Sequence, residues 1–253
     1  MATSSEQLRT RTYSRRSLHG QVAHEIAKRI MRGDFAPGQS LPSEAELSLE
    51  LDVSRTALRE AKKLLAGKGL VDSRPKLGTR VRPRGEWNML DPDILAWHAA
   101  AAPIDRMAHD LFEVRRMVEP YASGLAAKRA NATQIATIAV ALDDMVAAGD
   151  DVEASIEPDA RFHQAILEGT NNELLVAMGA VIEASLMSSI RISSSLPGAR
   201  LASLPLHENV LVAIRAGKAK AATRAMTVLL EGAIADIRQV LKGSAKTEQE
   251  MVG

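Results

Sequence analysis

The chain has 253 residues, enough for two ordinary domains, and 46% of them are hydrophobic although only 3% are aromatic. Alanine, leucine and methionine therefore supply most of the apolar volume, which favours helices packed on helices and predicts a mainly α fold. The absence of cysteine excludes a disulfide framework and a thiolate metal site, and it is typical of a reducing cytosol. The sequence has no run of eighteen apolar residues and no apolar N-terminal signal segment, so we expect a cytoplasmic protein without a membrane partner.

Positive charge is concentrated in the N-terminal part of the chain. Residues 1–85 contain 17 Lys or Arg and 9 Asp or Glu, a net charge of +8, whereas residues 86–253 contain 15 and 22, a net charge of −7. A basic region is suited to a polyanion, and an acidic region is poorly suited to lying on DNA. The charge distribution therefore predicts a nucleic-acid-binding part followed by a part with another role.

The first residues predict an arm and a helix. Residues 1–16 are rich in Ser, Thr and Arg and have little to bury, so we expect a disordered basic arm. In residues 18–32, apolar side chains recur at four-residue steps at Val22, Ile26 and Ile30. This spacing predicts one helix, which the following glycine ends.

Residues 43–67 carry two short helical patterns joined by a tight connection at residues 51–53. Ser43 and Ser54 are the expected N-caps of the two helices. The second pattern has an apolar stripe at three- and four-residue steps, made of Ala57, Leu58, Ala61, Leu64 and Leu65. Its other face is basic and carries Arg55, Arg59, Lys62 and Lys63. This face is either a solvated surface or a surface that meets DNA, with Thr56 beside the helix N-terminus.

The next segment predicts a β-hairpin. Residues 70–71 begin a short strand, and residues 79–82 alternate like a returning strand. Arg74 and Lys76 lie at the expected tip, and Gly78 supplies a permissive backbone position. Two helices followed by a basic hairpin indicate a winged helix-turn-helix.

Several spaced motifs in this part resemble one known family. They are Pro37-Gly38, Leu41-Pro42-Ser43-Glu44, Val53-Ser54-Arg55, Leu58-Arg59-Glu60-Ala61, Gly69-Leu70-Val71 and Gly78-Thr79-Arg80-Val81. Over residues 17–83 they are similar to the DNA-binding domain of GntR-type bacterial transcription regulators. The resemblance implies a DNA-binding set of Ser43, Ser54, Arg55, Thr56, Arg59, Arg74, Lys76 and Gly78, with the wing in the minor groove. Ala45 stands where some relatives carry a DNA-contacting arginine, which puts part of their specificity in doubt.

Residues 84–103 are expected to be a linker with a short helix. Proline and glycine at residues 83–85 break the preceding pattern, and Asp91 is the expected N-cap of the short helix. Both tryptophans of the chain, Trp87 and Trp97, fall in this segment. We expect them to pin the linker onto one of the two domains.

Beyond residue 103 nearly every segment has a helical pattern. The expected helices are at about 104–130, 133–148, 151–169, 172–194, 200–216 and 218–241. No strand pattern competes with them, so residues 104–242 predict an antiparallel all-helical bundle. Residues 243–253 are expected to be a disordered polar tail.

One constellation in the bundle has the spacing of metal ligands. Asp159 and His163 are four residues apart and project from one face of a helix, and His207 lies on a later helix. A carboxylate with two imidazoles suits Zn, Mn, Fe or Ni. Asp105 and His109 have the same spacing, so the spacing alone does not separate a metal site from a surface ion pair.

Further motifs lie in the same region. They are residues 115–119, 125–127, 159–163, 169–172, 207–210 and 213–217. They resemble the FCD effector domain of the FadR-type branch of GntR regulators, over about residues 104–240. Metal-binding members of that branch use an aspartate and three histidines, which implies Asp159, His163 and His207 as ligands here. Leu229 occupies the expected place of the last histidine, three residues after Met226, so the presence of a metal stays open.

A carboxylate effector would have two kinds of partner in such a bundle. A cation with three protein ligands keeps positions open for a carboxylate and a hydroxyl. A pocket without metal would depend on arginine, and Arg115 is the first candidate because a planar guanidinium pairs bidentately with a carboxylate. Arg161 and Arg191 are the next candidates. The alternative role of Arg115 is a salt bridge with Glu119, four residues along the helix.

These patterns lead to one main hypothesis and two alternatives. The main hypothesis is a homodimeric transcriptional repressor that leaves its double-stranded operator DNA when a small organic or sugar acid binds. Residues 90–97 are similar to the same segment in galactonate-type members, which favours a sugar acid. One alternative is a metal-dependent enzyme that uses Asp159, His163 and His207, although we expect no enzyme because no good nucleophile or general base lies near them in the sequence. The other alternative is a DNA-binding protein that responds to no ligand.

Overall fold

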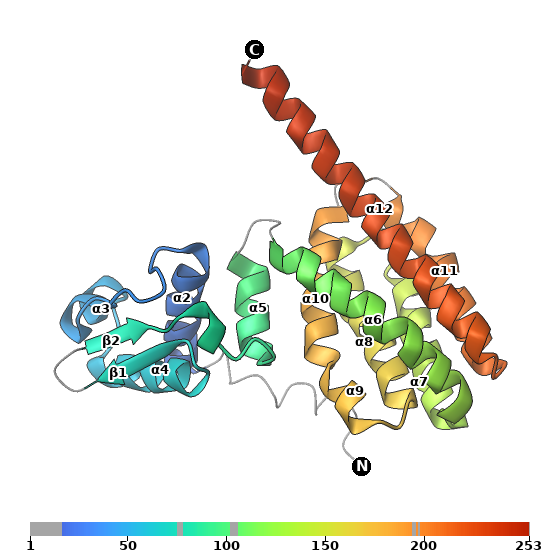
Figure 1. The fold of residues 1–253 in the computed structure, drawn as a ribbon, viewed down its shortest axis with the longest axis horizontal. Coiled ribbons are helices and arrows are strands. Elements are labelled where there is room, and N and C mark those ends of the chain that lie inside the picture. Colours follow the sequence, from blue (N-terminus) through green and yellow to red (C-terminus); the bar gives the residue numbers. More distant parts are fainter. Residues whose placement is uncertain (1–16, 75–77, 102–105, 194–195, 197, 253) are drawn as a thin grey trace. The chain divides into compact units, whose positions relative to one another are not determined.

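The computed structural model describes residues 17–74, 78–101, 106–193, 196 and 198–252, and it confirms a mainly α fold. The chain divides into two compact units, residues 1–103 and residues 104–253 (Figure 1). The expected basic arm at residues 1–16 lies outside the described residues, as does the expected wing tip at residues 75–77.

The N-terminal unit begins with three helices, α2 (Leu18–Arg32), α3 (Glu44–Glu50) and α4 (Arg55–Gly67). The predicted caps of the second and third helices are present. The Ser43 side chain accepts a hydrogen bond from the Glu46 backbone N–H within a capping box, and the Ser54 side chain accepts one from Ala57. These caps fix where α3 and α4 start, on either side of a connection of four residues.

A two-stranded antiparallel sheet follows α4. Strand β1 (Val71–Arg74) pairs with β2 (Gly78–Val81), and Val71 lies opposite Val81. Gly78 has φ +80°, in the left-handed region where a side chain is disfavoured. The described part of the chain therefore contains the predicted winged helix-turn-helix.

The segment after the sheet packs onto the N-terminal unit. It contains the short 3-10 helix η1 (Arg84–Glu86) and helix α5 (Pro92–Ala101). Its apolar side chains Trp87, Ile94 and Trp97 belong to the same buried core as Val22, Ile26, Ile30, Leu47, Leu58, Leu65, Leu70 and Val81. The described part of the expected linker is thus held by the N-terminal unit.

An ion cluster also holds this segment against the end of α4. Lys68, just after α4, places its Nζ 2.8 Å from Asp91 Oδ1 and 2.6 Å from Asp93 Oδ2. Burial lowers the pKa of Lys68, but the hydrogen bonds that its ammonium donates to the two carboxylates outweigh burial and raise the pKa above its ordinary value. The two aspartates therefore neutralise a largely buried ammonium.

The C-terminal unit is a bundle of helices. Its described helices are α6 (Arg106–Arg129), α7 (Ala132–Ala147), α8 (Val152–Gly169), α9 (Glu173–Ala177), α10 (Gly179–Ser193), α11 (Ala199–Arg215) and α12 (Ala219–Val252). Helix α12 packs along α6 and α11, and α7 packs along α8 (Figure 1). Within the described residues, we find no helix that is both long enough and apolar enough to span a bilayer.

Two details differ from the sequence expectation. The helix expected at 172–194 is divided into α9 and α10 at Met178. A Cβ atom on Gly179 would lie 1.8 Å from Gln164 Oε1, so the missing side chain lets α10 start close against α8. Helix α12 continues to Val252, where a disordered tail was expected from residue 243. The tail sequence contains Ala, Lys, Glu, Gln and Met, which all have good helix propensity, and no proline.

Three helices of the bundle contain an internal proline. These residues are Pro120 in α6, Pro158 in α8 and Pro205 in α11. Proline has no backbone N–H, so each one removes an intrahelical hydrogen bond. Each proline stands one or two residues from a polar side chain of the site described next.

Candidate functional site

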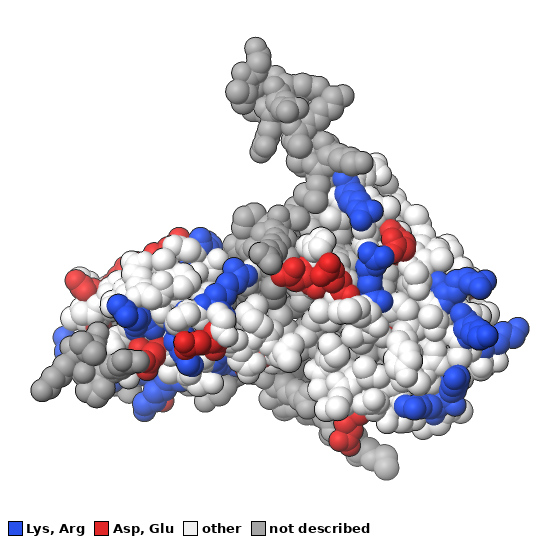
Figure 2. All heavy atoms as spheres, in the orientation of Figure 1, with Lys and Arg blue, Asp and Glu red and all other residues white. Residues whose placement is uncertain are grey.

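Helix α4 and its N-cap carry half of the predicted DNA contacts. Ser54, Arg55, Thr56 and Arg59 are all exposed. Arg59 Nε lies 2.9 Å from Glu44 Oε2, an ion pair of the kind that solvent weakens. On the face seen in Figure 2, acidic side chains lie among the basic ones of this unit, so its positive charge is not one continuous patch there. The side chain of Arg74 and all of Lys76 lie outside the described part.

The prediction that Lys62 lies on the exposed basic face of α4 is wrong. Its side chain is only 9% exposed, and its Nζ lies 4.0 Å from Glu44 Oε1. Burial lowers the pKa of Lys62, and the Glu44 carboxylate opposes this effect. Position 62 borders the apolar stripe of the helix, one residue after Ala61 and four after Leu58, so its alkyl stem packs against the core.

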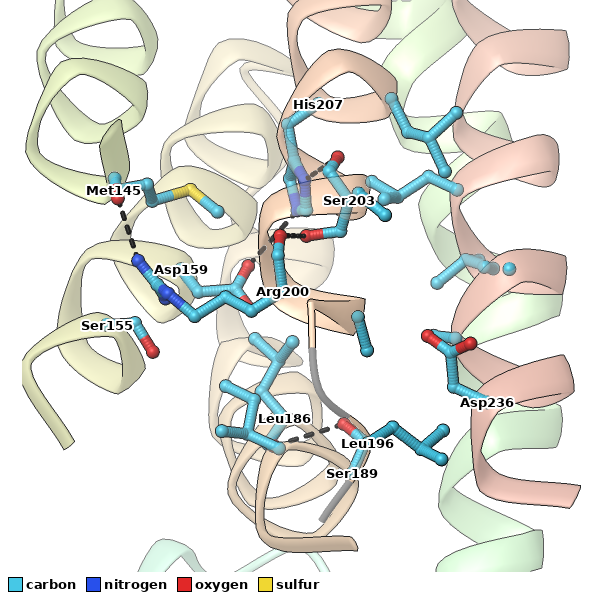
Figure 3. Close-up of a pocket in the computed structure, with 18 of the residues that line it drawn as sticks. Met145, Ser155, Asp159, Leu186, Ser189, Leu196, Arg200, Ser203, His207 and Asp236 are labelled. Carbon is cyan, nitrogen blue, oxygen red and sulfur yellow. Dashed lines mark hydrogen bonds and ion pairs between the residues drawn. The ribbon is translucent and has the colours of Figure 1, made fainter. Parts of the chain in front are cut away.

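A cavity of about 300 Å³ lies in the helical bundle. Helices α8, α10, α11 and α12 supply most of its wall, with Arg115 added from α6. Figure 3 shows its polar side chains, among them Asp159 on α8, Ser203 and His207 on α11, and Asp236 on α12. A volume of this size is at the lower end of the range for small-molecule pockets.

The three predicted metal-ligand residues converge at this cavity. His163 Nε2 and His207 Nε2 each lie 3.3 Å from Asp159 Oδ1. One ligand atom from each residue falls within 4.8 Å of the other two, and both imidazoles are buried. The structure therefore brings together residues from α8 and α11 that the sequence placed 44 positions apart.

The other nitrogen of each imidazole is held by an acceptor. His207 Nδ1 lies 2.9 Å from the Ser203 carbonyl, and His163 Nδ1 faces a carboxylate oxygen of Glu119. When Nδ1 donates its proton, a neutral imidazole presents a lone pair at Nε2. Both Nε2 atoms point at Asp159 Oδ1, a buried carboxylate oxygen. This donor set fits a divalent cation.

The charges of the site are strongly coupled. Burial lowers the pKa of His163, but the Glu119 charge and the hydrogen bond to Asp159 outweigh it and raise the pKa to about 9. Burial raises the pKa of Glu119, but Arg115 and His163 outweigh it and hold the pKa at about 2. Asp159 follows the same pattern, because both histidines hold its pKa well below the ordinary range.

Arg115 reaches the same group of atoms. Its Nε donates to Glu119 Oε1 at 2.5 Å, and its Nη2 lies 3.4 Å from His163 Nε2. Arg115 and Glu119 are each 2% exposed. The salt bridge expected as an alternative role thus exists, and the same guanidinium also lines the cavity.

Comparison with known proteins accounts for both units. Residues 18–81 match the bacterial regulatory proteins of the gntR family, and residues 110–232 match the FCD domain. The chain is 34% identical over 221 residues to an uncharacterized HTH-type transcriptional regulator, YieP, of Escherichia coli, a match that covers 86% of this chain and 94% of the relative. This chain belongs to the gntR family. It is a DNA-binding transcriptional regulator with an FCD domain.

Two further comparisons agree with this assignment. The regulator is 36% identical over 162 residues to the galactonate operon transcriptional repressor of Escherichia coli, covering 64% of this chain and 71% of that one. A solved structure of Lar, which controls the Listeria monocytogenes agr system, has a TM-score of 0.63 and 18% identity and covers 88% of this chain and 98% of its own. The latter likeness supports the fold alone.

The other predicted residues of the regulator lie elsewhere. Arg161 pairs with Asp144 at 2.9 Å and with Glu157 at 3.0 Å, and it does not line the cavity. The side chain of Arg191 lies outside the described residues. Leu229 is buried at 4% exposure and lines the cavity, where it supplies no ligand atom. His109 stands in an exposed cluster at the start of α6.

Glu119 and Arg200 are site residues that the sequence does not reveal. The sequence predicts Glu119 only as a salt-bridge partner of Arg115, because helical spacing does not reveal burial. Arg200, in the first turn of α11, donates to the Gly149 carbonyl at 2.5 Å and to the Met145 carbonyl at 2.8 Å. These bonds hold its guanidinium at the cavity wall (Figure 3). The Pro-Gly pair just before α11 marks a helix start but does not indicate which residue faces inward.

Proposed function

We propose that this regulator is a repressor whose operator binding is controlled by a small sugar acid bound in the cavity of the C-terminal unit. The convergence of His163 Nε2 and His207 Nε2 on Asp159 Oδ1, inside a cavity, is the observation that carries the proposal. The name of the relative that represses a galactonate operon supports a sugar acid. The acid supplies a carboxylate for the polar end of the pocket.

Asp159, His163 and His207 would hold a divalent transition metal, Zn, Mn, Fe or Ni. Such an ion would act as a Lewis acid that binds an effector carboxylate or hydroxyl. Ser203 and Glu119 keep the two imidazoles oriented with Nε2 toward the cavity. Arg115, fixed by Glu119, provides a second cationic group beside this position.

The DNA-binding part of the proposal concerns α4. We assign base and phosphate contacts to Ser54, Arg55, Thr56 and Arg59, because they are exposed around the first turns of the recognition helix. Ser43, Gly78 and the wing residues Arg74 and Lys76 complete the proposed interface. One recognition helix reads only a few base pairs, so we propose a homodimer on a pseudo-palindromic operator.

The test measures ligand and DNA binding together. Purified protein is analysed for metal, and thermal unfolding is followed with Zn²⁺ or Ni²⁺, with D-galactonate and with a chelator, because a ligand of the native state raises the apparent stability. A duplex selected from a random pool then serves as the operator in an anisotropy titration. We expect D-galactonate to weaken operator binding and His163→Ala to abolish this effect. An operator affinity that no sugar acid changes would refute the proposal, and turnover of the acid would favour the enzyme alternative.

A further inference from the structure

The wall that α12 contributes to the cavity carries one carboxylate beside apolar and small side chains, and it has no histidine. Helix α12 presents Leu229, Gly232, Ala233 and Asp236 to the cavity at three- and four-residue steps. The small side chains at 232 and 233 leave space between the leucine and the aspartate. In Figure 3, Asp236 lies across the cavity from Asp159 and Arg200. The cavity therefore has a second polar end that the proposed cation does not use.

Asp236 is a carboxylate without a partner in the described part of the protein. No described residue donates a hydrogen bond to it or pairs with it. Burial raises its pKa, and no charge of the described residues offsets this effect. Because no described residue donates to it, this carboxylate at the cavity wall can accept hydrogen bonds from a ligand that donates them.

The serines that line the same cavity can also accept hydrogen bonds from a ligand. The hydroxyl of Ser189 donates to the Ser185 and Leu186 carbonyls, that of Ser203 to the Arg200 carbonyl at 2.7 Å, and that of Ser155 to the Val152 carbonyl at 2.6 Å. A hydroxyl has one proton and two lone pairs, so each of these oxygens can still accept but has no proton left to donate.

The two ends of the cavity thus require opposite chemistry. The end at Arg115 and the proposed cation site attracts a carboxylate. The end at Asp236 and Ser189 accepts hydrogen bonds and repels a second carboxylate. From Leu229 to Asp236 the helix rises ~10 Å. A chain of six carbons with an oxygen at each end has seven bonds and spans ~8 Å when it is extended.

We propose that Asp236, together with Ser189, accepts hydrogen bonds from the hydroxyl groups at the far end of a monocarboxylic polyhydroxy acid. This inference rests on the proposed function and deepens it, because it selects aldonic acids over aldaric acids, which carry a carboxylate at both ends. It also selects them over short hydroxy acids, which do not reach Asp236. Asp236 is then a specificity-determining residue rather than a residue of the cation site.

The experiment compares three acids in the presence of Ni²⁺ by thermal shift and calorimetry. The probes are D-galactonate, galactarate and glycolate. The wild-type protein is expected to bind D-galactonate at least tenfold more tightly than galactarate. In Asp236→Asn, galactonate affinity should fall about tenfold, galactarate affinity should rise, and glycolate affinity should stay the same. Ser189→Ala should weaken galactonate binding alone. Asp143→Asn is the matched control, because Asp143 is exposed on α7 and away from the cavity.

The outcomes separate the inference from the proposed function. If no acid binds the wild-type protein with or without Ni²⁺, the proposed function fails and this inference with it. If D-galactonate binds but Asp236→Asn and Ser189→Ala leave its affinity within twofold, the assignment of Asp236 is wrong while the proposed function stands. If 6-aminohexanoate binds more tightly than D-galactonate and loses affinity in Asp236→Asn, the far end reads an ammonium group and the hydroxyl assignment is overturned.

Discussion

Replacing Glu119 by glutamine tests whether the buried charges stabilise the bundle. The Glu119 carboxylate accepts from Arg115 Nε and faces His163 Nδ1, and all three side chains are at most 2% exposed. Glutamine has nearly the same shape but no charge. The Arg115 guanidinium would then remain buried without a counter-charge, a change that typically destabilises proteins by about 3 to 5 kcal/mol.

The pKa of Glu119 gives the size of this destabilisation independently. The value in the folded protein is about 2 against an ordinary 4.5, and a difference of this size corresponds to about 3 kcal/mol. Because the folded-state pKa is lowered, the stabilisation is complete above pH 4.5 and is lost as pH falls through 2. By this linkage, about 1 kcal/mol remains at pH 3.

The assay is urea unfolding of wild type and Glu119→Gln in chelator at several pH values. The difference in unfolding free energy should be about 3 kcal/mol at pH 6 and should narrow to about 1 kcal/mol at pH 3. Glu113→Gln on the exposed side of the same helix should change stability by less than about 0.5 kcal/mol. If the unfolding free energies of wild type and Glu119→Gln differ little at pH 6, or differ as much at pH 3 as at pH 6, the Glu119 charge does not stabilise the bundle.

Three further predictions concern DNA, packing and pH. Arg55→Ala and Arg59→Ala should each weaken specific operator binding about tenfold or more at matched salt, and unchanged affinity would mean that α4 is not the recognition helix. Gly124→Ala places a Cβ 2.6 Å from Thr223 Oγ1, so it should destabilise by about 1 to 2 kcal/mol in urea unfolding, and Thr223→Ala in the same chain should restore stability. Since the pKa of His163 is raised to about 9, a cation must displace its proton, and Ni²⁺ affinity should fall about tenfold per pH unit from 8.5 to 6.5. A plateau over this range would indicate a neutral imidazole.

The fold followed from local signals that are strong in this chain. Caps at Ser43 and Ser54 fix the starts of α3 and α4, and apolar steps such as Val22, Ile26 and Ile30 determine the buried face of α2. Such signals depend on residues within one or two turns, so they are readable without a structure. The close approach of Gly179 to Gln164, at the start of α10, was not readable, because Gln164 belongs to another helix.

The site was predictable only in part, for a related reason. The spacing of Asp159 and His163 shows that they share a helix face, but the same spacing occurs at exposed positions. What distinguishes the site is burial and the contacts that hold each Nδ1, and these come from α6 and α11. Lys62 shows the converse error, because a charged residue in a basic stretch was assumed to face solvent. The pKa of His163 was not readable from the sequence either, since the buried Glu119 charge raises it from the ordinary 6.5 to about 9.

Internal prolines interrupt three helices of the bundle beside the polar residues of the site. Pro120 follows Glu119, Pro158 precedes Asp159, and Pro205 stands two residues before His207. The carbonyl four residues before each proline receives no hydrogen bond from the helix backbone. The helix therefore bends at that point at a lower free-energy cost than elsewhere. If a ligand draws these side chains together, we therefore expect the helices to bend at the prolines rather than to shift as rigid rods.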